Sequence, residues 1–263
     1  MNKTSPLNDT NKSNETVIEP IDNAESSPLK RGIYLLPNLL TTISLFMAFY
    51  AIVGAMKGEF ETAVIAVFIG IVADTLDGRV ARMTNTQTAF GAEYDSLADM
   101  VTSGVAPALI AYSSLLYNLG KLGWLIAFMY TAAVALRLAR FNTQLGVANK
   151  RYFQGLACPT GAAVVSSFVW LTEHYDFHNN VATIILAVLT LMVSVLMVSN
   201  VRYHSFKDID FKGRVPFVYI LSVVLLVAAI AVNPSLVLFV GFCVYALSGP
   251  IQTLMLLRQK MKH

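Results

Sequence analysis

Residues 60–99 read FETAVIAVFIGIVADTLDGRVARMTNTQTAFGAEYDSLAD, and this stretch decides how the rest of the chain is interpreted. Its first part is almost entirely apolar, and its second part contains four aspartates, at positions 74, 77, 95 and 99. An apolar run of about 20 residues can span a bilayer as a helix, whereas charged side chains in such a run are costly and usually mark function. The stretch therefore predicts two membrane helices that meet at a functional group of acids.

Long apolar runs continue on both sides of this stretch. They predict eight spans, at roughly residues 36–56, 60–82, 91–117, 121–141, 159–175, 181–200, 215–232 and 234–257. Strands are disfavoured because the runs are long and rich in Ala, Leu and Met. The expected fold is an all-α integral membrane protein with about eight transmembrane helices. The composition agrees, since 56% hydrophobic and 13% charged residues exclude a disordered chain, a basic nucleic-acid-binding domain and a disulfide scaffold.

The polar and basic residues predict the domain limits and the orientation. Residues 1–29 are rich in Asn, Ser, Thr, Asp, Glu and Pro and contain no aromatic residue, which predicts a disordered tail, and residues 30–263 form the membrane-embedded domain. Of the 19 Lys and Arg residues, all except Lys57 and Lys121 fall on one side of the eight-span arrangement. The positive-inside rule then places both termini in the cytoplasm and the protein in the cell membrane.

Helical spacing predicts that the four aspartates converge. Asp74 and Asp77 share one face of the second span, and Asp95 and Asp99 are separated by four residues at the start of the third. The connection 83–90 is short enough to make the two helices antiparallel neighbours. Four carboxylates can therefore meet near the cytoplasmic end of the bilayer, on the same side as the termini.

Four carboxylates in a small volume repel one another unless some are protonated or cations bind. Two divalent ions such as Mg²⁺ or Mn²⁺ would balance four negative charges, and no Cys or His in the cluster argues for zinc. Paired divalent ions suit phosphoryl chemistry, and Gly78 and Gly91 would let a ligand approach the helix backbones. The alternatives are an ion pathway, a proton relay or solvated charges at helix ends.

The pattern D74-x2-D77-G78-x2-A81-R82-x8-G91-x3-D95-x3-D99 resembles the signature of the CDP-alcohol phosphatidyltransferase family at every position. The resemblance implies a membrane enzyme that transfers a phosphatidyl group from a CDP-linked donor to an alcohol and releases CMP. It implies that Asp74, Asp77, Asp95 and Asp99 hold two metal ions, Mn²⁺ or Mg²⁺. It further implies that Asp99 is the catalytic general base for the acceptor hydroxyl.

The resemblance also implies a binding site for CDP-diacylglycerol. Its expected residues are Gly78, Ala81, Arg82, Gly91, Thr88 and Asn38. The last two lie outside the strict signature. For Thr88 the alternative is an ordinary loop residue, and for Asn38 it is a residue that starts a helix after Pro37.

Three further stretches, 136–142, 153–163 and 199–207, resemble the phosphatidylserine synthase branch of the family. This resemblance implies L-serine as acceptor, membrane lipids as surroundings and a homodimer. The carboxylate of serine needs a cationic partner, and Arg137 and Arg140 are spaced to face one cavity. The alternative is that both arginines are interfacial anchors.

Two other functions stay open at this point. The same chemistry could use a different acceptor, such as glycerol 3-phosphate or inositol phosphate, although a phosphorylated acceptor would need more cationic residues. A divalent-cation transporter could use the same carboxylates, but it would need acids near the bilayer midplane and an exit on the far side.

Overall fold

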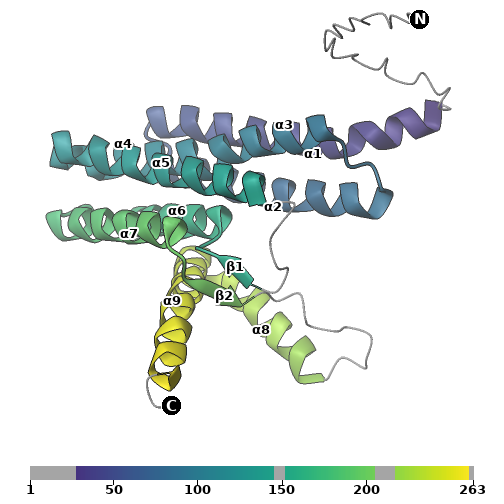
Figure 1. Cartoon of the computed structure of the whole chain (residues 1–263). Helices are drawn as coiled ribbons and strands as arrows, with labels where there is room; N and C mark the ends of the chain where they lie inside the picture. Colours follow the sequence, from purple (N-terminus) through teal and green to yellow (C-terminus); the bar gives the residue numbers. More distant parts are fainter. Residues whose placement is uncertain (1–27, 145–151, 205–216, 261–263) are drawn as a thin grey trace, which may run out of the picture.

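The computed structural model describes residues 28–144, 152–204 and 217–260. The helices in these ranges are α1 (Pro28–Met56), α2 (Phe60–Thr84), α3 (Ala89–Asp99), α4 (Ala106–Ser114), α5 (Lys121–Gln144), α6 (Cys158–His174), α7 (Asn180–Val198), α8 (Phe217–Val232) and α9 (Pro234–Lys260). Figure 1 shows the axes of α1 to α7 aligned with one another, with the connections between successive helices at two opposite ends. The expected all-α membrane architecture is confirmed, and its eight spans correspond to these helices once α3 and α4 are taken as one.

The third predicted span is one rod with an irregular middle. A π-helical segment, η1 (Met100–Val105), joins α3 to α4, and a short 3₁₀ segment, η2 (Leu116–Leu119), follows α4. A π turn accommodates an extra residue and is often found at functional sites. The π-helical segment begins directly after Asp99, so the backbone departs from an α-helix immediately after the last of the four signature aspartates.

Four helical segments in the described ranges are long and apolar enough to cross a membrane by length and composition. They are Leu35–Met56, Lys121–Thr143, Asn180–Val198 and Pro234–Thr253. Exposed apolar stripes fit this assignment: on α7, Val181, Ile184, Val188 and Val195 all point outward. Side chains three, four and seven residues apart share one helix face, so this stripe is suited to lipid tails.

The core is built around α6 and around small residues that let helices approach closely. Nearly every side chain of α6 from Cys158 to Trp170 is buried. Between α1 and α2, Ala48, Ala51 and Ala63 are fully buried, which allows the two helices to pack along their length. The beginning of α9 packs against the end of α6, because Asn233 Nδ2 donates to Tyr175 Oη at 2.6 Å and Phe239 contacts Phe168 further along.

Two short strands correct the expectation that the chain contains no strand. Strand β1 (Tyr152–Gln154) pairs antiparallel with β2 (Arg202–His204), with Phe153 opposite Tyr203. The strands precede α6 and follow α7, at one end of the helices (Figure 1). Backbone N–H and C=O groups outside helices need partners, and this pairing supplies them.

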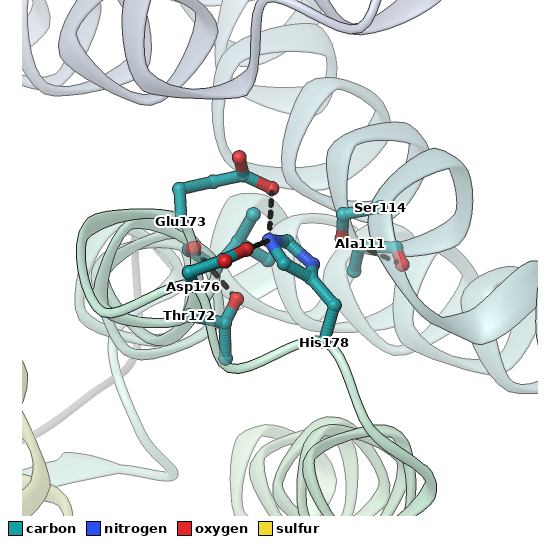
Figure 2. Close-up of polar contacts among 7 residues, drawn as sticks. Ala111, Ser114, Thr172, Glu173, Asp176 and His178 are labelled. Atoms are coloured by element: carbon teal, nitrogen blue, oxygen red, sulfur yellow. Dashed lines mark hydrogen bonds and ion pairs between the residues drawn. The ribbon is translucent and has the colours of Figure 1, made fainter.

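The opposite end contains the turn between α6 and α7. His178 Nε2 lies 3.5 Å from Glu173 Oε1 and 3.9 Å from Asp176 Oδ1, and Figure 2 shows this polar group between α6 and the following turn. The N-cap of α7 is Asn179, whose side chain accepts from the backbone N–H of Ala182. Residues 1–27 of the predicted disordered tail (1–29) lie outside the described residues, whereas residues 28 and 29 are the first two of α1, which corrects the predicted boundary.

Candidate active site

Three of the predicted carboxylates form a compact group. Asp74 and Asp77 come from the last turns of α2, and Asp95 comes from α3. One carboxylate oxygen from each residue lies within 4.8 Å of those of the other two, which is close enough for all three to hold one metal ion. The convergence predicted for Asp74, Asp77 and Asp95 is therefore present, although α3 packs mainly against α1.

Asp99 lies beside this group but outside it. The Asp74 carboxyl group is within hydrogen-bonding reach of those of both Asp95 and Asp99. Asp74, Asp95 and Asp99 each have one Oδ1 atom that is buried and has no hydrogen-bond partner among the described residues. Buried carboxylate oxygens without donors are costly, and oxygen-only ligand sets suit Mg²⁺ and Mn²⁺. These residues fit a bound divalent metal.

The orientation of Asp77 depends on a residue that sequence reasoning missed. Thr41 Oγ1 donates to Asp77 Oδ2 at 2.5 Å and also lies 3.1 Å from the backbone oxygen of Pro37. Thr41 and Asp77 are both 3% exposed, so this contact is protected from water. Helix α1 thus supports a carboxylate on α2. The signal was a hydroxyl residue at a buried face of the first span, but spacing alone does not say which acid it meets.

Gly91 brings together two residues expected to contact the donor. A Cβ atom at Gly91 would lie 3.0 Å from Thr88 Oγ1 and 3.2 Å from Asn38 Oδ1. Thr88 is the N-cap of α3, and its side chain accepts from the Gly91 N–H at 3.0 Å. Asn38 lies inside α1, which begins at Pro28, so the alternative of a helix-starting residue is wrong. Donor contact by Asn38 and Thr88 stays a prediction.

The remaining signature residues line the end of α2. A Cβ atom at Gly78 would meet only Arg82 Nη2, at 3.8 Å, so the surface beside Gly78 is open. Arg82 is exposed and Ala81 is half-buried. An exposed guanidinium next to open backbone, on the same helix as Asp74 and Asp77, can bind a diphosphate.

The two arginines expected to bind serine point to different partners. Arg137 Nη1 donates to Cys158 Sγ at 3.3 Å, its Nε is buried without a partner among the described residues, and its charge interacts with Asp99. Arg140 Nη1 donates to the Val198 carbonyl at 3.3 Å, and its Nη2 donates to Asn200. Arg137 therefore lies within electrostatic range of Asp99, whereas Arg140 contacts the end of α7.

Two polar contacts connect α3 to its neighbours. Tyr94 Oη and Thr42 Oγ1 are 3.0 Å apart, which joins α3 to α1. Asn142 Nδ2 donates to Ser96 Oγ at 3.0 Å, which joins α3 to α5. Asn142 lies within a stretch that carried the resemblance to the serine branch, but sequence gave it no specific role.

A cavity of about 630 Å³ lies at the opposite end of the helices, lined by residues that include Ser113, Asn118, Glu173 and His178. Figure 2 shows Glu173 and His178 facing each other there. None of the signature residues lines this cavity. The carboxylate group and the cavity are therefore separate places in the fold.

Comparison with known proteins agrees with the geometry. Residues 34–198 match the sequence profile of the CDP-alcohol phosphatidyltransferase family. A relative from Helicobacter pylori, CDP-diacylglycerol–serine O-phosphatidyltransferase, is 38% identical over 226 residues, which cover 86% of this chain and 93% of the relative. A protein of the same name from Methanocaldococcus jannaschii is 32% identical over 81% of this chain and 94% of its own length. Another from Bacillus subtilis is 34% identical over 65% of this chain.

The matched region begins in α1 and ends with α7, so it contains all four aspartates, both glycines and both arginines discussed above. The family expectation from the aspartate pattern is confirmed by a match to more than half of the chain. The chain belongs to the CDP-alcohol phosphatidyltransferase family.

Proposed function

We propose that this chain is a phosphatidylserine synthase, which transfers the phosphatidyl group of CDP-diacylglycerol to L-serine and releases CMP. The observation that carries the proposal is the group of largely enclosed carboxylates on α2 and α3, with the cation of Arg137 within electrostatic range of Asp99. The relatives named CDP-diacylglycerol–serine O-phosphatidyltransferase, which cover most of the chain, support the choice of serine.

Asp74, Asp77 and Asp95 would hold one divalent metal ion. Asp99, together with Asp74, would hold a second. Two divalent ions, Mn²⁺ or Mg²⁺, would balance the four negative charges of the carboxylates. When bound, such ions neutralise charge on the diphosphate oxygens and on the departing CMP. Thr41 keeps Asp77 turned toward the group through its short hydrogen bond.

Asp99 accepts the proton of the serine hydroxyl. The unpartnered Oδ1 of Asp99 is available for that proton, and a positioned carboxylate can act as a general base at neutral pH. The serine oxygen then forms a bond to the phosphorus that carries diacylglycerol, and the bond from that phosphorus to the bridging diphosphate oxygen breaks. CMP leaves with this oxygen, and Arg82 at the exposed end of α2 binds its phosphate.

Arg137 would bind the serine carboxylate. Its Nε is buried without a partner among the described residues, and its charge lies near Asp99, so a serine bound there would place its hydroxyl toward the base. Arg140 was expected to share this role, but it already contacts Val198 and Asn200. We therefore propose that Arg137 makes the main contact with the serine carboxylate, and kinetics of an Arg140 variant test whether Arg140 also contacts it.

The donor's diphosphate would lie along the glycines. Gly78 offers open backbone, and Asn38, Thr88 and Gly91 form a polar corner at the start of α3. The acyl chains would stay in the lipid beside the exposed apolar residues of α1, such as Leu39 and Phe46. This arrangement keeps the lipid tails in the bilayer while the reacting groups lie at its edge.

CMP release by the purified full-length protein tests this function. With CDP-diacylglycerol and Mn²⁺, L-serine should support release, whereas glycerol 3-phosphate and inositol phosphate should not. Asp95→Asn should abolish release, and Asp176→Asn, at the fully exposed far end, should not change it. Release with another acceptor alone would contradict serine specificity. No release with any acceptor, together with Mn²⁺ uptake into vesicles, would favour the transporter.

For the topology, we propose that both termini and the carboxylates face the cytoplasm. Seventeen of the 19 Lys and Arg residues on one predicted side support this orientation. In Asp176→Cys, a membrane-impermeant maleimide should label residue 176 only from outside the cell. In Gln87→Cys, between α2 and α3, labelling should require opened membranes. The reverse pattern would contradict the orientation.

The family resemblance also predicts a homodimer. The mass of the purified protein, after subtraction of detergent by light scattering, should be twice the 28.7 kDa of one chain. A mass of one chain in active preparations would rule out an obligate dimer.

A further inference from the structure

The backbone after Asp99 departs from an α-helix at a defined point. The N–H of Ala106 donates to the carbonyl of Val101, five residues earlier, where an α-helix would use the residue four earlier. The next residue is Pro107, which has no N–H and cannot donate to the carbonyl of Ser103. Ser103 is buried, so its carbonyl needs another donor.

That donor comes from another helix. The hydroxyl of Tyr130, on α5, donates to the Ser103 carbonyl at 2.8 Å. Tyr130 is fully buried, and its hydroxyl is directed at the one carbonyl that Pro107 leaves without an α-helical donor. A buried tyrosine hydroxyl usually has a partner, and here that partner lies in the π-helical segment that follows Asp99.

The same face of α5 follows this segment back to Asp99. Tyr130, Val134 and Arg137 are spaced by four and three residues and so share one face. A Cβ atom at Gly104 would lie 3.2 Å from Val134 Cγ1, which shows how closely η1 packs against α5. Arg137 is the residue on this face whose charge reaches Asp99. One stripe of α5 therefore contacts both the π segment and the carboxylate before it.

The register of the segment decides where the carboxylates of α3 point. Helix α4 is fixed in the core by Ala106, Ile110 and Ala111, which are fully buried. Removing the extra residue of a π turn rotates one side of a helix relative to the other by about 100°. With α4 held in place, loss of the π turn would turn α3, and Asp95 and Asp99 with it, away from α2.

We propose that Tyr130 is a positioning residue for the reaction, because its bond to Ser103 ties the π-helical segment that follows Asp99 to α5 and so holds Asp99 toward the carboxylates of α2. This inference rests on the proposed role of Asp99. It adds a residue that belongs to no signature position and touches no reacting atom. Pro107 is its partner, since Pro107 prevents Ser103 from forming the ordinary α-helical bond.

Tyr130→Phe in the full-length protein removes only the hydroxyl. We expect kcat to fall by about 10- to 100-fold, while the KM values for CDP-diacylglycerol and serine stay within about twofold. Tyr117→Phe, at an exposed position at the other end of the helices, is the matched control and should leave kcat unchanged. An unchanged kcat in Tyr130→Phe would overturn the proposal.

A double variant separates positioning from simple stability. Pro107→Ala in the Tyr130→Phe background supplies an N–H that can pair with Ser103 at α-helical spacing. We expect this variant to regain thermal stability without regaining kcat, because the Ser103 carbonyl is then satisfied within its own helix while the link to α5 is still missing. Recovery of stability and kcat together would overturn the positioning role. Failure of both variants to fold would make Tyr130 a residue of the fold alone, which also overturns it.

The wild-type protein keeps this test separate from the proposed function. If wild type releases CMP only with an acceptor other than serine, serine specificity fails, and the variants are compared with that acceptor. Mn²⁺ binding, measured by titration calorimetry, gives a readout independent of turnover. It should weaken in Tyr130→Phe because Asp95 and Asp99 are displaced from Asp74, and unchanged Mn²⁺ affinity would count against a rotated α3.

Discussion

Thr41 and Asp77 lie 36 positions apart in the sequence, yet the threonine hydroxyl is 2.5 Å from the aspartate Oδ2. Both side chains are buried, and they join α1 to the helix that carries the first two signature aspartates. Partners that orient metal ligands typically contribute 10- to 100-fold to metal affinity or activity. Helix α1 therefore orients a carboxylate of α2.

Thr41→Val should lower Mn²⁺ affinity and activity by roughly 10-fold or more, because Asp77 loses its hydroxyl donor. Thr41→Ser keeps the hydroxyl and should remain close to wild type. Thr75→Val is the matched control, since the Thr75 hydroxyl bonds only to the carbonyl of Ile71. Titration of Mn²⁺ into each variant measures the effect, and equal losses in Thr41→Val and Thr75→Val would contradict it.

Arg137→Gln and Arg140→Gln should separate substrate binding from helix packing. Loss of a charge-assisted hydrogen bond costs about 1.5–3 kcal/mol, so the serine KM of Arg137→Gln should rise by roughly 10- to 150-fold. The KM for CDP-diacylglycerol should change little. Arg140→Gln should instead lower the melting temperature, because Val198 and Asn200 lose a donor. Equal rises in serine KM would assign both arginines to the acceptor.

Cys158→Val tests what fixes Arg137. Cys158 is fully buried and accepts a hydrogen bond from Arg137 Nη1. Without this acceptor Arg137 gains freedom, and the serine KM should rise by a few fold with kcat nearly unchanged. Cys158→Ser keeps an acceptor and should show a smaller rise. The same kinetics for Cys243→Val, in α9, would indicate a general packing effect.

Local spacing predicted most of what is local in this fold. The eight apolar runs correspond to helices. The spacing of Asp95 and Asp99, together with the short connection 83–90, predicted that the carboxylates of the two helices meet. The β1–β2 pair was missed because each strand has three residues and gains stability only from the other. The π segment was missed because a single proline after it does not indicate a π turn, and the hydroxyl that bonds to its Ser103 carbonyl comes from Tyr130 on another helix.

Residues that act across helices could not be predicted in the same way. Arg140 and Val198 are 58 positions apart, and nothing in either neighbourhood indicates that they meet. Arg137 and Arg140 are spaced to share one helix face, but their long side chains contact different helices. Periodicity gives the face of a helix, whereas the partner across it depends on how whole helices pack.

The two signature glycines should respond differently to alanine. At Gly91 a Cβ atom would crowd Thr88 Oγ1 and Asn38 Oδ1, so Gly91→Ala should lower the melting temperature and raise the KM for CDP-diacylglycerol. At Gly78 the nearest atom, Arg82 Nη2, is 3.8 Å away and flexible. Gly78→Ala should therefore keep its melting temperature and raise only the donor KM. A normal donor KM in Gly78→Ala would mean that no ligand approaches there.

Divalent metal should stabilise the protein through the carboxylate group. Buried oxygens of Asp74, Asp95 and Asp99 without donors repel one another until a cation binds. Mn²⁺ at about 100 times its Kd stabilises the folded state by about 2.7 kcal/mol, which corresponds to a rise in Tm of roughly 5–10 °C for a chain of this size. A thermal scan in detergent with and without Mn²⁺ measures this rise.

Asp95→Asn should change the melting temperature in opposite directions without and with Mn²⁺. Removing one negative charge relieves repulsion, so the metal-free variant should melt at a higher temperature than the metal-free wild type. The same change removes a ligand, so the Mn²⁺-dependent rise should be lost. Asp176→Asn, at a fully exposed position far from the group, should alter neither value. A full Mn²⁺-dependent rise in Asp95→Asn would place the stabilising metal elsewhere, because only a site that uses Asp95 couples these two effects in opposite directions.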